Sequence, residues 1–134
     1  MKTSKPDLLL RTMAVLAIAF GLLTIVSGGR ALFGGDAARL SAGAYVPFVL
    51  WFNFAAGFAY VAAGAGLWLQ RRWAVGLAAA IAVATLLVFA AFGVHVMSGG
   101  AYENRTVAAM TLRSAVWLAI AWLSARRPRR QDRR

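Results

Sequence analysis

The sequence predicts an all-α integral membrane protein, a four-helix bundle of antiparallel, up-and-down spans joined by short loops. Three observations predict it. Hydrophobic residues make up 61% of the 134 residues, the apolar residues fall into four long runs, and basic residues flank those runs. Long apolar runs at such a composition are typical of membrane spans, and flanking Lys and Arg residues set their orientation.

The first apolar run covers about residues 8–29. At ~1.5 Å per residue it reaches about 33 Å, enough to cross a hydrocarbon core of ~30 Å. Lys2 and Lys5 precede it, and Arg11 lies one turn inside, where its long side chain can reach the interface. The alternative is a signal peptide with a cleavage site in Ser27–Gly29, whose removal would leave three spans in the same orientation.

The second run covers about residues 44–69 and follows a loop at 30–43. Within that loop Asp36 is expected to cap a short surface helix that runs through Leu40. Pro47 falls in the first turn of the second span, where the missing N–H costs little.

The third and fourth runs cover about residues 73–97 and 102–124. Only residues 70–72 separate the second and third runs, so these two spans are predicted to be antiparallel neighbours. The four spans form one domain, residues 1–125. The remainder, 126–134, is predicted to be a basic, disordered cytoplasmic tail.

Basic residues are distributed unequally between the two sides of the predicted bundle. Eleven of the fifteen Lys and Arg residues lie in the N-terminal segment, the second loop and the tail, against three in the first and third loops. This asymmetry predicts a plasma (inner) membrane protein with both termini in the cytoplasm, touching anionic headgroups there rather than nucleic acid. The predicted topology anchors are Lys2, Lys5, Arg11, Arg71, Arg72, Arg126 and Arg127.

Small residues recur at helical spacing in the second and third spans. Such surfaces let helix backbones approach closely in a membrane. They predict either packing within the bundle or a homo-oligomer. The two predicted stripes are Ala55, Ala59 and Ala63, and Gly76, Ala80 and Ala84.

Arg113 is the most informative polar residue inside a span. It lies ten residues after Glu103, or about 15 Å along the helix, which places it near mid-membrane. Both side chains lean toward the helix N-terminus, so Glu103 is a poor partner. The partner of Arg113 is therefore expected from another span, from water or from a ligand.

Other polar residues share helix faces that are predicted to turn inward, in the half of the bilayer opposite the termini. They predict a polar chamber that opens to the outside. The alternative is that these groups only satisfy one another and fix helix register. The predicted chamber residues are Thr24, Ser27, Asn53, Tyr60, His95, Glu103, Thr106 and Arg113.

The sequence contains no cysteine and no recognisable catalytic motif, which argues against an enzyme and against a metal or other cofactor. The favoured function is an accessory or structural membrane subunit with a protein partner. One alternative is a small transporter or binder that recognises a polar or anionic ligand with Arg113. Another is a quinol- or haem-linked redox protein that uses His95 and Glu103 as a proton relay.

Overall fold

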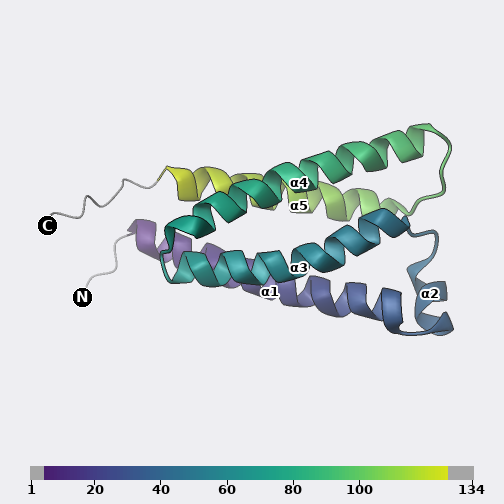
Figure 1. The fold of residues 1–134 in the computed structure, drawn as a ribbon, viewed down its shortest axis with the longest axis horizontal. Helices are drawn as coiled ribbons and strands as arrows, with labels where there is room; N and C mark the ends of the chain where they lie inside the picture. Colours follow the sequence, from purple (N-terminus) through teal and green to yellow (C-terminus); the bar gives the residue numbers. More distant parts are fainter. Residues whose placement is uncertain (1–4, 127–134) are drawn as a thin grey trace, which may run out of the picture.

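The computed structural model describes the chain from residue 5 to residue 126, and its side chains from residue 8 onward (Figure 1). Within that range the regular structure is all helical. Four helices are long and apolar enough to cross a membrane, which confirms the predicted all-α class and its four apolar runs. The helices are α1 (Lys5–Phe33), α2 (Asp36–Ala42), α3 (Pro47–Trp68), α4 (Arg72–Met97) and α5 (Asn104–Ala125).

The first helix extends beyond the predicted run 8–29 at both ends. Gly28 and Gly29 lie inside the helix rather than at its end. A Cβ atom built on Gly28 would lie 3.2 Å from the Cβ of Phe54, so α3 packs directly on the helix at this point. That close packing offsets the low helix propensity of glycine. The helix ends just before Gly35, whose φ of 84° lies in the left-handed region.

The short helix after α1 corrects one detail of the prediction. The expected helix exists and runs to Ala42, but Gly35 is its N-cap residue and Asp36 lies in its first turn. There the carboxylate faces the positive end of the helix dipole, which favours it without a cap hydrogen bond. None of the residues of α2 is buried. The other long helices begin and end within three residues of their predicted bounds, and Pro47 opens α3 as expected.

The four long helices lie along the longest axis of the molecule (Figure 1). The start of α1, the α3–α4 turn and the end of α5 lie at one end, which we call the basic end. The helix α2 and the α4–α5 connection lie at the other, which we call the α2 end. Helix α3 packs along α1, and α4 packs against both α3 and α5. Helices α1 and α5 have no comparably extensive backbone contact.

Glycines allow the closest helix pair, α1 with α3, to form. A Cβ atom on Gly57 would lie 2.7 Å from Ile25 Cγ1 and 3.1 Å from the carbonyl oxygen of Gly21, which is too close for a side chain. Gly64, two turns further along α3, is equally crowded by α1. Of the predicted alanine stripe of this span, Ala63 is buried in the core and Ala59 packs against it, whereas Ala55 is exposed. The closest approach to α1 is made by the glycines and not by this stripe.

The predicted small-residue stripe on α4 lies mostly outside the face that packs. Ala74, Ala78 and Ala82 are buried against neighbouring helices. Gly76 and Ala80 are exposed, and no atom lies within 4 Å of a Cβ built on Gly76. Small-residue spacing occurs on two faces of α4, and only the tertiary contacts distinguish them.

The apolar core is divided unequally between the two ends of the bundle. The larger cluster joins α1, α3, α4 and α5, and includes Tyr60 and Trp117. The smaller cluster consists of Val46, Val49, Phe92 and Met110, with no member from α1. As a result, no residue of α1 belongs to the core cluster that contains Met110 of α5 near the α2 end.

Candidate functional site

Near the α2 end an open cavity of about 270 Å³ lies between α1, α3 and α5. It brings together most of the residues predicted from sequence to form a polar chamber. Tyr60 and His95 are the two predicted residues that do not line it. The predicted residues that line it are Thr24, Ser27, Asn53, Glu103, Thr106 and Arg113.

Arg113 forms the deep end of this cavity. Its side chain is only 9% exposed, and its Nη1 donates a hydrogen bond of 3.1 Å to Thr24 Oγ1 on α1. The guanidinium carbon lies 5.0 Å from the ring centre of Phe20 and 6.0 Å from that of Tyr60. These are cation–π distances, so aromatic faces provide part of the stabilisation of the charge. As predicted, a partner of Arg113 comes from another span.

The remaining hydrogen-bonding capacity of Arg113 is not satisfied by the described side chains. Its Nε is buried without a partner. The described side chains include two carboxylates, Asp36 on α2 and Glu103, and the Glu103 carboxylate accepts a hydrogen bond from the backbone N–H of Ala44 at 2.8 Å. Arg113 therefore has a full charge and five N–H donors, but no described carboxylate as a counter-ion.

An aromatic cluster closes the bundle on the basic-end side of Arg113. Tyr60 is completely buried between two rings, with centroids 5.7 Å from Phe20 and 4.8 Å from Trp117. The hydroxyl of Tyr60 and the indole N–H of Trp117 have no hydrogen-bond partner among the described residues. Tyr60 therefore packs beside the guanidinium instead of lining the cavity.

Asn53 contributes a further polar group to the cavity wall from α3. Its side-chain oxygen is buried without a partner in the described part of the chain. With the hydroxyls of Thr24, Ser27 and Thr106, it gives the cavity neutral polar groups next to the fixed charge of Arg113. These groups favour the binding of a polar ligand rather than a purely apolar one.

Two side chains at the start of α5 connect it to the α2–α3 segment. Glu103 is the N-cap residue of α5 but makes no cap hydrogen bond, since its carboxylate binds Ala44 instead. Arg105 Nη2 donates to the carbonyl oxygens of Ser41 and Ala42, at 3.2 and 3.4 Å. We call these contacts the strap. The sequence identified Arg105 only as a loop charge, because hydropathy does not show which backbone carbonyls a loop residue meets.

His95 lies away from the cavity lining. Its Nε2 is 3.0 Å from the carbonyl oxygen of Ala101, and its ring meets Phe48 edge-on at 6.4 Å. Among the residues that the structure describes, no group of three His, Asp or Glu side chains is placed to hold a metal ion.

Of the residues predicted to be topology anchors, those whose side chains are described all belong to the basic end. Arg11 lies 5.2 Å over the ring of Trp68, and Arg126 lies 4.1 Å over that of Trp122. Arg71 is the N-cap residue of α4, and Arg72 is its first residue. Lys2 and Arg127 lie outside the described residues, as does the predicted tail beyond Arg126. Lys5 begins α1, but its side chain is also outside the described set.

The described polar side chains that line the cavity comprise the buried guanidinium of Arg113, the charged groups of Arg105 and Glu103, hydroxyls and a carboxamide. No protein-family model, curated protein or solved structure matches the chain. The interpretation of the site therefore depends on its geometry and charge.

Proposed function

We propose that the chain is an integral protein of the plasma (inner) membrane, whose four long helices cross the bilayer as an antiparallel bundle. Large apolar side chains cover the outside of these helices, among them Leu23, Leu87 and Trp122, which are 68%, 66% and 56% exposed. An apolar surface of this extent is unfavourable in water and favourable in hydrocarbon. Helices also satisfy their backbone groups internally, as a bilayer requires.

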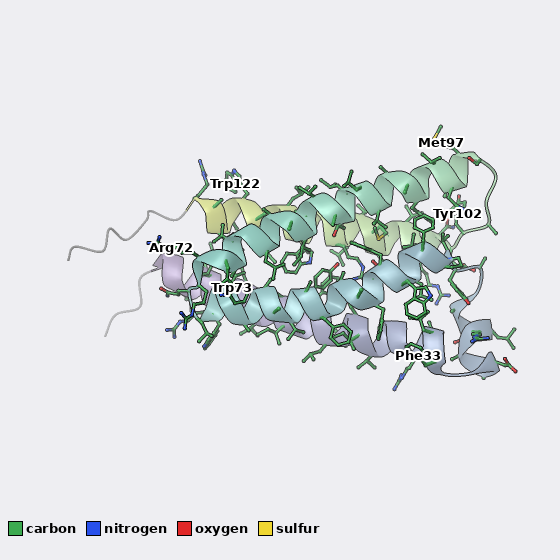
Figure 2. The ribbon with its side chains drawn as sticks, viewed as in Figure 1. Phe33, Arg72, Trp73, Met97, Tyr102 and Trp122 are labelled. Carbon is green, nitrogen blue, oxygen red and sulfur yellow. The ribbon has the colours of Figure 1, made fainter. Side chains whose placement is uncertain are left out.

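The distribution of charged and aromatic residues supports an orientation with both termini in the cytoplasm. Trp73 and Trp122 lie near the basic end, whereas Phe33 and Tyr102 lie near the α2 end (Figure 2). Aromatic residues near both ends are typical of the two membrane interfaces, and clustered arginines are typical of the cytoplasmic one. The arginines of the basic end are Arg11, Arg71, Arg72 and Arg126.

We infer that this bundle binds a small anionic ligand in the cavity, with Arg113 recognising its charge. The observation that carries the proposal is that Arg113 is buried at the cavity and forms no ion pair with a described carboxylate, since the carboxylate of Glu103 binds the N–H of Ala44. A central Arg costs roughly 2.5–3.5 kcal/mol in a membrane helix. A residue that only fixed helix register would not require a permanent charge, whereas an anion would neutralise it and accept its free N–H groups.

The direct test compares the purified wild-type protein with Arg113→Leu in a panel of soluble and lipid anions. We expect at least one anion to raise the melting temperature of the wild-type protein, because binding to the folded state stabilises it. No anion should stabilise Arg113→Leu, which should itself be as stable as the wild type or more so, since an uncompensated buried charge is gone. Collapse of the Arg113→Leu bundle, or anion shifts that persist in it, would contradict the proposal.

A second candidate function is an accessory membrane subunit. The exposed small residues Gly76 and Ala80 on α4 favour it, because they offer a close-approach surface that no described helix of this chain covers. Copurification after mild solubilisation would support this function. A protein that is strictly monomeric and free of partners under those conditions would count against it.

A further inference from the structure

The cavity reaches the surface of the bundle beside Ser27 of α1, which lines the cavity and is exposed. We call this opening the α1–α5 seam and define it by Thr24 and Ser27 on α1 and by Thr106 and Ala109 on α5. All four residues line the cavity. Ser27 is exposed, and the core cluster at this end has no member from α1. Thr24 at the deeper end of the seam is buried and accepts the hydrogen bond from Arg113, so the seam is closed there and open beside Ser27.

The strap bridges the same cavity at the α2 end. Ala42 and Tyr45 of the α2–α3 segment line the cavity, as do Glu103 and Arg105 of α5. Three hydrogen bonds join the two segments across this end: Ala44 to Glu103, and Arg105 to the carbonyl oxygens of Ser41 and Ala42. In a membrane-inserted bundle the strap faces water and the seam faces lipid.

The charge of the cavity lining sets the charge of a matching ligand. Arg105 and Arg113 each contribute one positive charge and Glu103 one negative charge, which leaves a net charge of plus one. Because uncompensated charge is costly in an apolar surrounding, a singly charged anion is the best complement. The side chain of Arg113 leans toward the N-terminus of α5, that is, into the cavity, where it can meet an oxyanion that lies nearer the interface.

We propose that the ligand is an amphiphile: its singly charged oxyanion head occupies the cavity against Arg113, and its apolar tail leaves through the α1–α5 seam into the bilayer. This inference rests on the proposed anion-binding function and names its ligand class. A phosphodiester lipid and a fatty-acid carboxylate share this chemistry. A soluble anion that passes the strap is the competing source, and the experiment separates the two.

The first arm measures binding to the full chain in uncharged detergent micelles by native mass spectrometry. The probes are phosphatidylglycerol, phosphatidylcholine with the same acyl chains, and water-soluble glycerophosphoglycerol, which has the head without the tails. We expect phosphatidylglycerol to bind at least about 10-fold more tightly than either of the others. Arg113→Gln should weaken phosphatidylglycerol binding by about 10- to 100-fold, because it removes a charged hydrogen-bond donor.

The second arm tests the seam itself. The chain has no cysteine, so Ser27→Cys can be modified selectively with a bulky, bilayer-soluble maleimide. The modified protein should bind phosphatidylglycerol at least about 10-fold more weakly than the same unmodified variant, because the adduct fills the path of the tail. Leu22→Cys is the matched control: Leu22 is 53% exposed on the same helix, about 140° around its axis from Ser27. Its modification should change binding less than about 2-fold.

The possible outcomes distinguish a failure of the amphiphile proposal from a failure of the proposed anion-binding function. Equal binding of glycerophosphoglycerol and phosphatidylglycerol would overturn the amphiphile and leave anion binding standing. Tight phosphatidylglycerol binding that survives modification of Ser27→Cys would overturn the seam as the path of the tail. If no anion, soluble or lipid, binds the wild-type protein, the proposed function itself fails.

Discussion

At the scale of single residues, the environment of Arg113 distinguishes this bundle from a simple set of apolar spans. The guanidinium has one described hydrogen bond, to Thr24, and two aromatic faces from Phe20 and Tyr60. Buried polar groups are normally paired, and those left unpaired cost stability. Of the buried polar atoms without a partner among the described residues, those of Asn53 and Arg113 lie on residues that line the cavity, and those of Tyr60 and Trp117 lie in the aromatic cluster beside it.

Removing the acceptor of Arg113 should destabilise the bundle. Thr24→Val removes the acceptor of the Arg113 Nη1 hydrogen bond and keeps the side-chain volume. We expect the free energy of unfolding to fall by about 1–3 kcal/mol. Thr12→Val is the matched control on the same helix, because Thr12 is exposed and binds only the carbonyl oxygen of Leu8. The free energy of unfolding of Thr12→Val should differ from that of the wild type by less than about 0.5 kcal/mol. Thermal unfolding of both variants in micelles measures the difference, and equal stability of the two would contradict a paired Arg113.

Removing a buried hydroxyl without a partner should have the opposite effect. In Tyr60→Phe the ring keeps its contacts with Phe20 and Trp117, and the unsatisfied hydroxyl is removed. We expect equal or greater stability, by up to about 1 kcal/mol, in the same unfolding measurement. A clear loss of stability would show that the hydroxyl has a partner in the working protein.

At the scale of elements, the interface of α1 with α3 depends on glycine at defined positions. Gly57 and Gly64 on α3 face Gly21 and Ile18 on α1 without room for a side chain. Where no hydrophobic effect acts between helices in a membrane, such close contact is a main source of association. The length of α1 follows from the same interface, because packing on Phe54 carries the helix through Gly28 and Gly29.

Substitutions of glycine should therefore differ by position. In Gly57→Ala the new methyl would lie 2.7 Å from Ile25 Cγ1, so the helices must separate, and we expect a loss of about 1–3 kcal/mol. Gly93→Ala on α4 is the control, because a Cβ atom at this position would have no described atom within 4 Å. It should be neutral or stabilising by up to ~1 kcal/mol, since alanine is the better helix former. Equal free energies of unfolding for Gly57→Ala and Gly93→Ala would contradict the tight interface.

At the scale of the whole molecule, charge is polarised along the bundle axis. Among the described side chains, the basic end carries four arginines and no carboxylate, whereas the α2 end carries three arginines with Asp36 and Glu103 (Figure 1). The four arginines of the basic end are Arg11, Arg71, Arg72 and Arg126, and the three of the α2 end are Arg30, Arg39 and Arg105. The opposite end carries α2, the strap and the cavity. If the basic end is cytoplasmic, the cavity belongs to the outer half of the membrane.

Cysteine labelling tests this orientation. Ser98→Cys lies in the α4–α5 connection at the α2 end, and Ala125→Cys lies at the end of α5; both positions are exposed. In intact cells a membrane-impermeant maleimide should modify Ser98→Cys and should reach Ala125→Cys only after the membrane is permeabilised. The reverse pattern would contradict the orientation, and recovery of the protein in the soluble fraction would contradict membrane insertion.

The sequence by itself determined the helical class, the four apolar runs and most of the cavity residues. These follow from local physics: apolar run length sets the helices, and helical periodicity places Thr24, Asn53, Thr106 and Arg113 on shared faces. The partner of Arg113 was also constrained, since a carboxylate on the same helix leans away from it.

Only the tertiary structure decided which helices meet and which faces they use. Small residues occur on several faces of α3 and α4, so spacing alone did not identify Gly57 and Gly64 as the closest approach to α1, or the buried alanines as the packed face of α4. The strap, the burial of Tyr60 beside the guanidinium and the position of His95 depend on contacts between segments far apart in the chain. The opening of the cavity beside Ser27 has the same origin, because α1 packs along α3 and makes far less backbone contact with α5.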